Sequence, residues 1–264
     1  MDLDLHGRIA VVSGSTGGIG YAIAEGLARQ GAHVVVNGRT EARVADAIRR
    51  IHVAVEGAQV SSAPFDLATA DGVAALVAAF PIADIVVNNL GIYEMKPFAD
   101  ITDADWLRFF ETNVLSGVRL SRAYLPHMRE RDWGRVIFIS SESGLNIPVE
   151  MVHYGMTKSA QLSVARGIAE TVAGTGITVN SVLPGPTSSE GVGAFIASMA
   201  EARGIAEADV EREFIRTARP TSLIKRLATV DEVANMVVYL CTPAASATTG
   251  ASVRVDGGVV KTIA

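Results

Sequence analysis

The sequence predicts a single α/β domain, built on a doubly wound parallel sheet of about seven strands with helices on both faces. Short apolar runs alternate with helical patterns along the chain, an order that predicts βαβ units with right-handed crossovers. Some of these runs, such as 85–87, are continuous Val and Ile, which is typical of strands covered on both faces. No linker, repeat or low-complexity segment interrupts the 264 residues, so we expect one domain, 1–264.

Each predicted element has its own signal. The first strand, 9–12, is followed by apolar residues at helical spacing from Ile19, and Gly31 ends that helix. Further strands are expected at 33–37, 59–65, 84–88, 135–140, 177–183 and 252–255, and helices at 41–51, 69–79, 103–130, 151–173 and 230–242.

The segment 186–228 departs from this alternation. It holds two helical patterns, 191–203 and 207–217, with no strand between them. An excursion of this size in a compact domain is typical of a lid or a binding element. A helical pair that caps the sheet permanently is the alternative.

Composition and charge exclude several classes of function. The chain has 23 basic and 28 acidic residues, a net charge of −5, and no dense run of Lys or Arg. Because a nucleic-acid-binding surface needs a basic face, we expect no nucleic-acid partner. Charged residues make up only 19% of the chain, below the roughly 25% usual for soluble domains. This shortage indicates that other subunits cover part of the surface.

The single cysteine and the N-terminus indicate the compartment. Cys241 has no second cysteine to pair with, and we expect it to pack as a small apolar residue in a late helix. The first eight residues carry two acids and no apolar run, unlike a signal peptide. The charge-poor stretch 172–189 contains Gly, Asn and Pro, unlike a membrane span. We therefore expect a cytoplasmic protein without a membrane partner, and no metal site, because no His, Cys or Asp cluster has ligand spacing.

A glycine-rich turn between Ser13 and Gly20 joins the first strand to its helix. Glycines at such a turn let the backbone approach a pyrophosphate, which the free N–H groups of the helix N-terminus stabilise. The turn predicts a Rossmann-type dinucleotide site. Its candidate residues are Gly14, Ser15, Thr16, Gly18, Ile19 and Gly20.

The end of the second strand indicates which dinucleotide binds. Enzymes of this architecture that use NAD carry an acid about 20 residues beyond the glycines, where it accepts hydrogen bonds from the ribose hydroxyls. Here the strand ends in Asn37-Gly38-Arg39 without an acid. Because a guanidinium suits a ribose 2′-phosphate, Arg39 predicts that NADP is preferred, with NAD as a second possible cofactor.

Further candidates follow the third and fourth strands. Ligands bind at the carboxyl ends of strands in open α/β sheets, so cofactor contacts are expected there, with turn or capping roles as the alternative. These candidates are Asp66, Leu67, Asn89 and Gly91.

Ser141, Tyr154 and Lys158 indicate the chemistry. Ser141 ends the fifth predicted strand, whereas Tyr154 and Lys158 lie four residues apart in a helical pattern and so share one face. A free tyrosine has a pKa of about 10, and a neighbouring lysine cation favours its phenolate. A Tyr-x-x-x-Lys pair alone is a weak signal. Its place behind a nucleotide loop and a strand that ends in serine is what predicts proton transfer beside a dinucleotide.

These motifs resemble those of the short-chain dehydrogenase/reductase family over nearly the entire chain. The glycine turn resembles the family's Thr-Gly-x-x-x-Gly-Ile-Gly motif, and residues 88–91 resemble its Asn-Asn-Ala-Gly motif. The resemblance implies catalytic residues at Asn113, Ser141, Tyr154 and Lys158. It also implies that one segment holds the nicotinamide, through Pro184, Gly185, Thr187 and Ser189. Residues 256–258 match the family's C-terminal turn.

Three residues depart from the family motifs. Ser13 and Ser189 stand where threonine is usual, and both keep the hydroxyl. Leu90 replaces a small alanine, which is expected to add bulk close to the cofactor.

The resemblance implies an NAD(P)-dependent oxidoreductase that interconverts a carbonyl and a secondary alcohol by hydride transfer. Tyr154 would exchange a proton with the substrate oxygen, while Lys158 would lower the pKa of the tyrosine and hold the nicotinamide ribose. Ser141 would bind the substrate oxygen, and Asn113 would anchor a water that leads to Lys158. A dinucleotide-binding regulator without turnover is the alternative from another class.

Other catalytic chemistries fit poorly. A Ser-His-Asp hydrolase lacks its Gly-x-Ser-x-Gly elbow. Glu142 and Glu150 are loop carboxylates, which we expect to be solvated.

The substrate pocket is expected to be apolar and to take a hydrophobic ketone or alcohol, because 93–95, 144–151 and 186–217 should line it. A 3-oxoacyl-thioester (acyl-carrier-protein) reductase is the alternative. Such an enzyme is expected to bind the phosphate of the carrier at a basic rim, and here acidic neighbours reduce the positive charge of that rim. The arginines of that rim would be Arg203, Arg212, Arg216 and Arg219. The resemblance implies a homotetramer, and we expect 186–228 to close as a lid over the nicotinamide.

Overall fold

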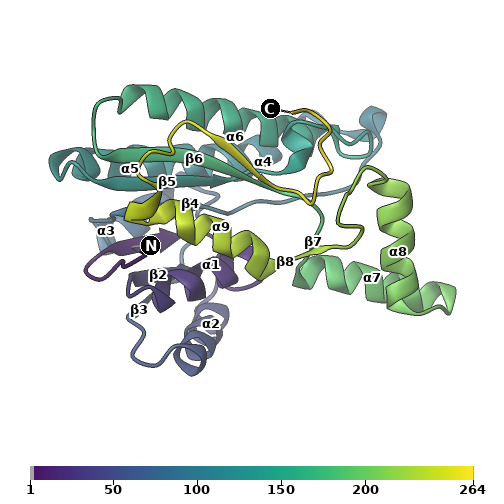
Figure 1. The fold of residues 1–264 in the computed structure, drawn as a ribbon, viewed down its shortest axis with the longest axis horizontal. Coiled ribbons are helices and arrows are strands. Elements are labelled where there is room, and N and C mark those ends of the chain that lie inside the picture. The colour runs from purple at the N-terminus through teal and green to yellow at the C-terminus, as the bar shows by residue number, and fades with distance from the viewer. Residues whose placement is uncertain (1–2, 264) are drawn as a thin grey trace.

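Seven parallel strands form the central sheet, in the order β3-β2-β1-β4-β5-β6-β9 (Figure 1). The computed structural model describes residues 3–263. The strands are β1 (Ile9–Val12), β2 (His33–Asn37), β3 (Val60–Ala63), β4 (Ile85–Asn88), β5 (Gly134–Ile139), β6 (Ile177–Pro184) and β9 (Ser252–Val255). The predicted doubly wound sheet is confirmed, and each of its strands lies within two residues of the predicted bounds.

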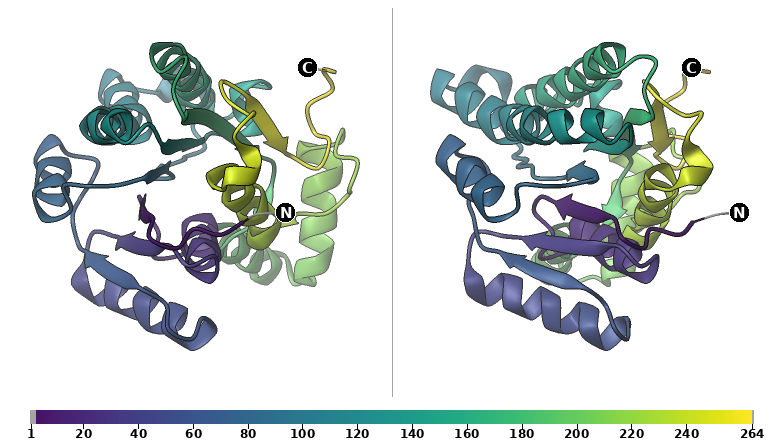
Figure 2. Two further views of the ribbon diagram at one scale, coloured as in Figure 1. Left: turned by 60° about the vertical axis from the view of Figure 1, so that its left-hand side comes forward. Right: turned by 90° about the vertical axis from the view of Figure 1, so that its left-hand side faces the viewer.

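Helices cover both faces of the sheet (Figure 2). One face carries α1 (Gly18–Arg29), α2 (Glu41–Ala54) and α9 (Val230–Cys241). The other carries α3 (Ala70–Ala79), α5 (Ser116–Glu130) and α6 (Val152–Thr171), and α4 (Asp103–Phe110) packs against α6. Single 3₁₀ turns lie at Phe98–Asp100, Glu142–Gly144 and Pro243–Ala245.

The alternation of side chains along each strand builds two separate cores. In β1, Ala10 and Val12 join the core beneath α1 and α9, whereas Val11 joins the core beneath α5. Both kinds of position are apolar because both faces of a parallel sheet are covered. Cys241, at the end of α9, is fully buried in the first core, as the sequence predicts.

The order of strands reverses between β1 and β4. From β1 the chain runs outward through β2 and β3, and from β4 it runs the other way through β5 and β6. At such a switch point the loops that follow the two central strands diverge and leave a crevice. The glycine turn after β1 and the turn after β4 therefore lie at the place where an open sheet binds its ligand.

The predicted helix at 103–130 contains an irregularity that its sequence pattern does not reveal. Between α4 and α5 the backbone forms a π-helical turn at Glu111–Leu115, while φ and ψ stay helical on both sides. Such π turns recur at functional sites because the wider turn re-aims side chains. Here the turn contains Asn113.

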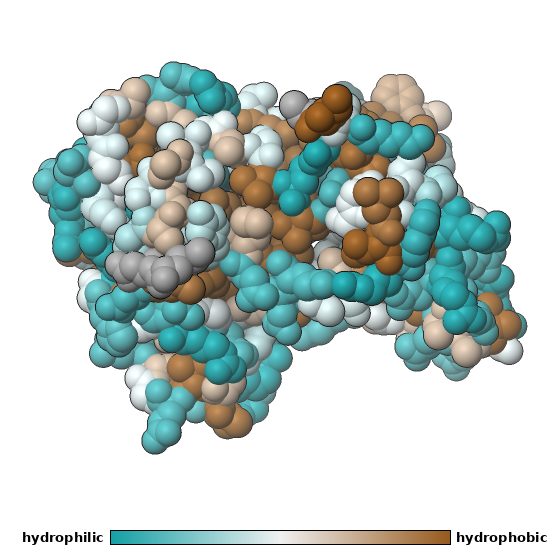
Figure 3. Space-filling model, viewed as in Figure 1, coloured by the Kyte–Doolittle hydropathy of each residue, from teal (hydrophilic) through white to brown (hydrophobic). Residues whose placement is uncertain are grey.

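The excursion at 186–228 forms the two predicted helices, α7 (Glu190–Arg203) and α8 (Glu207–Ala218). They pack on each other around a third, smaller core that includes Ile196 and Ile215. A short ladder that the sequence does not predict closes its base, where β7 (Thr187–Ser188) pairs with β8 (Ala228–Thr229). In Figure 3 the α7–α8 pair projects from the body as a lobe whose visible face is mainly hydrophilic.

Within residues 3–263, none of the helices combines the length and the apolar character needed to cross a membrane.

Candidate active site

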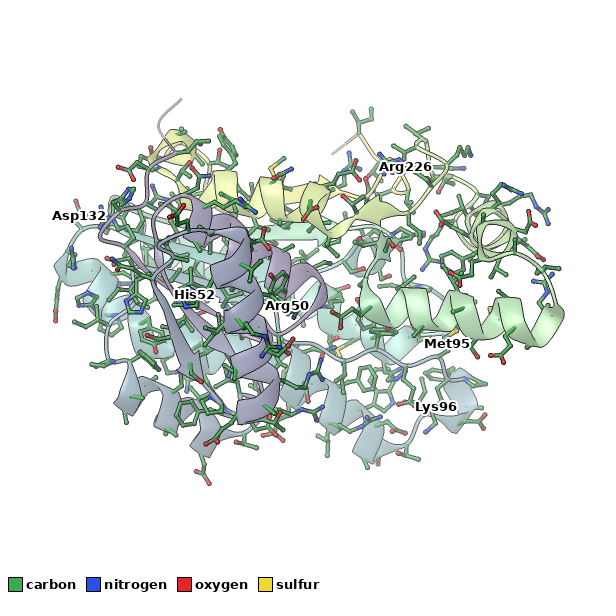
Figure 4. The ribbon with its side chains drawn as sticks, turned by 90° about the horizontal axis from the view of Figure 1, so that it is seen from below. Arg50, His52, Met95, Lys96, Asp132 and Arg226 are labelled. Atoms are coloured by element: carbon green, nitrogen blue, oxygen red, sulfur yellow. The ribbon has the colours of Figure 1, made fainter. Side chains whose placement is uncertain are left out.

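A cavity of about 710 Å³ lies at the carboxyl ends of the central strands. Its walls come from the loops after β1, β4, β5 and β6 and from the first turn of α7. In Figure 4, Met95 from the loop after β4 lies beside α7, and Met95 and Val192 line the same cavity. Its lining thus joins the glycine turn, the predicted catalytic residues and the excursion.

The glycine turn has backbone positions that only glycine fits. Gly14 and Gly18 have φ angles of +61° and +54°, a region that side chains with a Cβ rarely adopt. A Cβ on Gly20 would lie 2.4 Å from the Asn89 side-chain nitrogen and from the Gly14 carbonyl oxygen. The turn and the start of α1 can therefore approach a pyrophosphate closely, as a dinucleotide site requires.

Buried polar side chains hold this turn against the neighbouring strands. Asn37, at the end of β2, accepts a hydrogen bond from the Gly14 N–H at 3.0 Å and donates to the Ala63 and Phe65 carbonyls. Ser13 Oγ accepts hydrogen bonds from the N–H groups of Asn89 and Leu90. The hydroxyl that Ser13 shares with threonine thus joins the turn after β1 to the turn after β4.

Lys158 lines the cavity from α6, and its side chain is buried. Nζ donates to the Ile139 carbonyl at 2.9 Å and to Gln161 Oε1 at 3.1 Å. It lies 5.5 Å from the centre of the Tyr154 ring. Burial lowers the pKa of Lys158 to about 7, because a desolvated ammonium is costly.

Tyr154 lies one helical turn before Lys158, on the same face of α6, as its spacing predicts. Burial raises its pKa to about 12, while a hydrogen bond from Ser141 lowers it. Ser141 follows β5 and lines the cavity with Tyr154. The ring of Tyr93 meets Tyr154 edge-on, with centroids 6.5 Å apart.

Asn113 is buried behind Lys158 and is connected to it by a third side chain. The Asn113 carboxamide bonds the backbone of Ile92 in both directions and donates to Thr157 Oγ1. The backbone carbonyl oxygen of Asn113 accepts a 2.7 Å hydrogen bond from Gln161 Nε2, and Gln161 Oε1 accepts a hydrogen bond from Lys158 Nζ. The resemblance implies that a water anchored by Asn113 leads to Lys158. In this structure the side chain of Gln161 connects these two residues directly.

The structure brings most of the predicted site residues to this one cavity. They are Gly14, Thr16, Gly18, Ile19, Gly20, Asn89, Gly91, Ser141, Tyr154, Lys158, Pro184, Gly185, Thr187 and Ser189. Asn113 is behind the wall, where its Oδ1 would lie 3.5 Å from a Cβ on Gly91.

Four predicted cofactor residues do not line the cavity. Ser15 is buried and bonds Val12 and Asn37, and Leu67 is buried in the core beneath α5. Arg39 and Asp66 are exposed at the ends of their strands. Their assignment to the cofactor stays a prediction.

The expectation that loop carboxylates are solvated is wrong for Glu142. Its side chain is only 3% exposed and bonds Arg219 at 2.8 Å. Both residues line the cavity. The reason is the 3₁₀ turn after Ser141, which directs residues 142–144 inward.

Comparisons with known proteins agree on the family. A family model described as enoyl-(acyl carrier protein) reductase matches residues 14–260. The chain is 46% identical over 263 residues to an uncharacterized oxidoreductase of Bacillus subtilis, YvaG, and covers 100% of both chains.

The chain belongs to the short-chain dehydrogenase/reductase family. It is also 34% identical to D-beta-hydroxybutyrate dehydrogenase of Rhizobium meliloti, over 95% of this chain and 98% of that one. A solved structure of L-sorbose reductase from Gluconobacter frateurii, complexed with NADPH and L-sorbose, has a TM-score of 0.94 at 32% identity and covers 100% of both chains. As a member of this family, the chain is an NAD(P)-dependent oxidoreductase that interconverts a carbonyl and an alcohol.

One departure from the family motifs is absorbed by packing. The side chain of Leu90 packs on the core beneath α5 and does not line the cavity. The bulk that was expected close to the cofactor is therefore directed into the protein.

Two residues of the site, Arg43 and Gln161, were missed by the sequence analysis. Arg43, in the first turn of α2, lines the cavity; its place shortly after the end of β2, where a ribose phosphate is expected, was an available signal. Gln161 lies one turn after Lys158, a position that the helical period also places on the same face. Phe214 of α8 also lines the cavity and lies within 186–217, which the sequence analysis expected to line it.

We predict that Gln161→Glu moves the pH dependence of alcohol oxidation upward by about one pH unit. A carboxylate beside Nζ stabilises the ammonium and disfavours a nearby phenolate, so the pKa values of both Lys158 and Tyr154 rise. Oxidation needs the Tyr154 phenolate beside a protonated Lys158, so the pair must lose one proton. The added carboxylate makes that loss harder, and the rate therefore reaches its half-maximal value at a higher pH.

The matched control is Gln59→Glu, which makes the same chemical change at an exposed position. Its pH–rate profile should overlie that of the wild type. A Gln161→Glu profile that also overlies the wild type would show that Gln161 does not act on the catalytic pair.

Proposed function

We propose that Ser141, Tyr154 and Lys158 carry out the proton transfer of the carbonyl–alcohol reaction, with Asn113 and Gln161 positioning Lys158. The observation that carries this proposal is the convergence of the three side chains on the cavity that also contains the glycine turn. When bound, a nicotinamide dinucleotide supplies or accepts the hydride.

In the direction of reduction, Tyr154 donates its hydroxyl proton to the substrate oxygen. Its raised pKa keeps the phenol protonated at neutral pH in the ligand-free protein, which suits a proton donor. Ser141 donates a hydrogen bond to the same oxygen and stabilises the negative charge that develops there. In the direction of oxidation, Tyr154 takes the proton, and a protonated Lys158 lowers the cost of the phenolate.

The cofactor is proposed to lie along the glycine turn with its nicotinamide near Tyr154. The residues that would hold it are Gly14, Thr16, Gly18, Ile19, Gly20, Asn89, Gly91, Pro184, Gly185, Thr187 and Ser189. Lys158 would also bond the nicotinamide ribose, because a Cβ on Gly91 would lie 3.6 Å from Nζ and glycine leaves that approach open.

Two alternatives receive less support. A binding protein without turnover would not need a complete set of catalytic residues, and all four positions are filled. A reductase of acyl-carrier-protein thioesters would need free arginines for a phosphate. Three of the four arginines of the predicted rim, Arg203, Arg212 and Arg219, instead pair with Glu213, Asp209 and Glu142, so that within the described residues only Arg216 of the four has no ion pair.

The preference for NADP over NAD is proposed from Arg39 and Arg43. Both are exposed near the first turn of α2, and neither forms an ion pair within the described residues. The NADPH in the similar L-sorbose reductase structure supports this preference.

The excursion is proposed to act as a lid. A Cβ on Gly191 would lie 2.7 Å from the Tyr93 hydroxyl, so α7 begins against the catalytic wall. Hydrogen exchange of 187–217 measures the motion, and equal protection with and without NADP⁺ and substrate would contradict it.

A homotetramer is proposed from the large apolar residues that stay exposed on and before α4, Phe98, Leu107 and Phe110. A sedimenting species of 27.7 kDa, the mass of one chain, would contradict it.

We predict that Arg39→Ala weakens NADPH binding by about 10- to 100-fold and leaves NADH binding within about twofold. The change removes a charge-assisted hydrogen bond to the 2′-phosphate, which only NADPH carries. Titration of the nicotinamide fluorescence measures both affinities. Arg49→Ala, which changes an exposed arginine of α2, is the control. Equal losses for both cofactors in Arg39→Ala would refute the assignment.

We predict that Tyr154→Phe lowers kcat by at least about 100-fold, which is the range of a lost general acid, while NADPH still binds. NADPH oxidation is followed by absorbance over a panel of ketones, sugars and acyl thioesters. Tyr239→Phe, which changes a tyrosine outside the cavity, should leave the rates unchanged. If the Tyr154→Phe variant reduced these substrates at wild-type rates, the proposed mechanism would be contradicted.

A further inference from the structure

A buried ion pair lies in the substrate end of the cavity. Glu142 is 3% exposed and Arg219 is 11% exposed, and Arg219 Nε donates to Glu142 Oε1 at 2.8 Å. Glu142 follows Ser141 directly, whereas Arg219 follows α8 and so belongs to the excursion. The pair therefore joins the catalytic strand end to the lid across 77 residues of sequence.

Stability alone gives little reason for such a pair. Two buried charges lose their hydration, and apolar residues of similar size are often as stable or more stable in their place. The pair is also close enough to Tyr154 to act on it, since Glu142 raises and Arg219 lowers the pKa of the tyrosine. A costly pair beside the reacting group indicates a role in the reaction.

Both partners keep hydrogen-bonding capacity that the protein does not use. Arg219 Nη1 donates to the Ala218 carbonyl, but Nη2 has no hydrogen-bond partner within residues 3–263. Among the described residues, Glu142 Oε2 has no donor either. Glu142 Oε2 is removed from water, and the Arg219 side chain is only 11% exposed, so a ligand that satisfies these groups gains more than it would at the surface.

The local charge distinguishes between classes of ligand. The Arg219 guanidinium faces Glu142 at 2.8 Å and Glu150 at 3.8 Å, so its positive charge is already balanced. A carboxylate or phosphate on the substrate would meet these two acids. A hydroxyl can accept from Nη2 and donate to a carboxylate, and it brings no charge.

We infer that Arg219, held in place by Glu142, binds a hydroxyl group of the substrate near its reacting carbon, so that the enzyme acts on hydroxy ketones and their diols. The other side chains at this end are largely apolar, including Met151, Val192 and Phe214. These side chains would contact the carbon chain of the substrate, whereas the ion pair would bind its hydroxyl group. This inference rests on the reaction proposed above. It replaces the hydrophobic ketone expected from the sequence by a ketone that carries a hydroxyl group.

The test compares three four-carbon carbonyl compounds that differ in their substituent: butan-2-one, 3-hydroxybutan-2-one and acetoacetate. With NADPH, wild-type kcat/KM for the hydroxy ketone should exceed that for each of the other two by about tenfold or more. A site that hydrogen-bonds a substrate hydroxyl discriminates strongly against an analogue that lacks it.

The variant is the double change Glu142→Gln with Arg219→Met. Removing both charges avoids leaving one buried charge unpaired, which would itself threaten folding. The ratio of kcat/KM between hydroxy ketone and butan-2-one should fall to about one, while NADPH affinity and the melting temperature stay near their wild-type values. The matched control is Glu213→Gln with Arg203→Met, which removes an exposed ion pair of the same excursion and should keep the ratio.

Each other outcome overturns the inference. A preference for acetoacetate that the double variant loses would mean that Arg219 binds the carboxylate of the substrate. An unchanged ratio in the double variant would mean that the pair serves structure only. If wild type accepts none of the three compounds and, from the wider panel, reduces only carbonyls that lack a neighbouring hydroxyl, the hydroxy-ketone assignment is wrong and the reaction class stands.

Discussion

A buried amine sets the conditions for the rest of this active site. Lys158 has no carboxylate partner within the described residues, and its Nζ is held by one backbone carbonyl and one side-chain amide. Burial lowers its pKa to about 7, so protons can leave and return near neutral pH. An exposed lysine would stay charged and could not respond when the neighbouring tyrosine gains or loses a proton.

The surrounding structure is arranged to allow this burial. Ser140 donates to the Lys158 carbonyl and fixes the start of this turn of α6 against β5. A Cβ on Gly144 would lie 3.0 Å from the Lys158 backbone, so glycine is needed for the close approach of the turn after Ser141. The π turn before α5 places the Asn113 carbonyl where Gln161 can bridge it to Nζ. Sheet, helix and π turn therefore position one nitrogen atom.

Much of this arrangement could be predicted because its determinants are local. A period of 3.6 places Tyr154 and Lys158 on one face, and the parallel sheet brings the strand ends, and with them Ser141 and the glycine turn, to one edge. The family motifs add residues such as Asn113, whose neighbouring sequence contains no chemical signal of its own.

The remaining features depend on contacts between distant segments. The bridge from Gln161 to Asn113 spans 48 residues, and the ion pair of Arg219 with Glu142 spans 77. From the sequence, Glu142 is expected to be a solvated loop acid, because no neighbouring residue indicates that an arginine of the excursion pairs with it. The direction of the Leu90 side chain is likewise decided by the core beneath α5 and by no local pattern. Propensity and spacing cannot reveal such tertiary contacts.

The pKa of Lys158 in the ligand-free protein tests the central claim most directly. The chain contains only four lysines, Lys96, Lys158, Lys225 and Lys261, so NMR of lysine labelled with ¹³C at Cε resolves them with few signals. The signal missing from Lys158→Met identifies the catalytic residue. We expect that signal to titrate near pH 7, whereas the pKa of Lys96 is raised above its usual 10.5 by its hydrogen bond with Asp105. Titration of the Lys158 signal above pH 10 would contradict the view that burial of Lys158 tunes this active site.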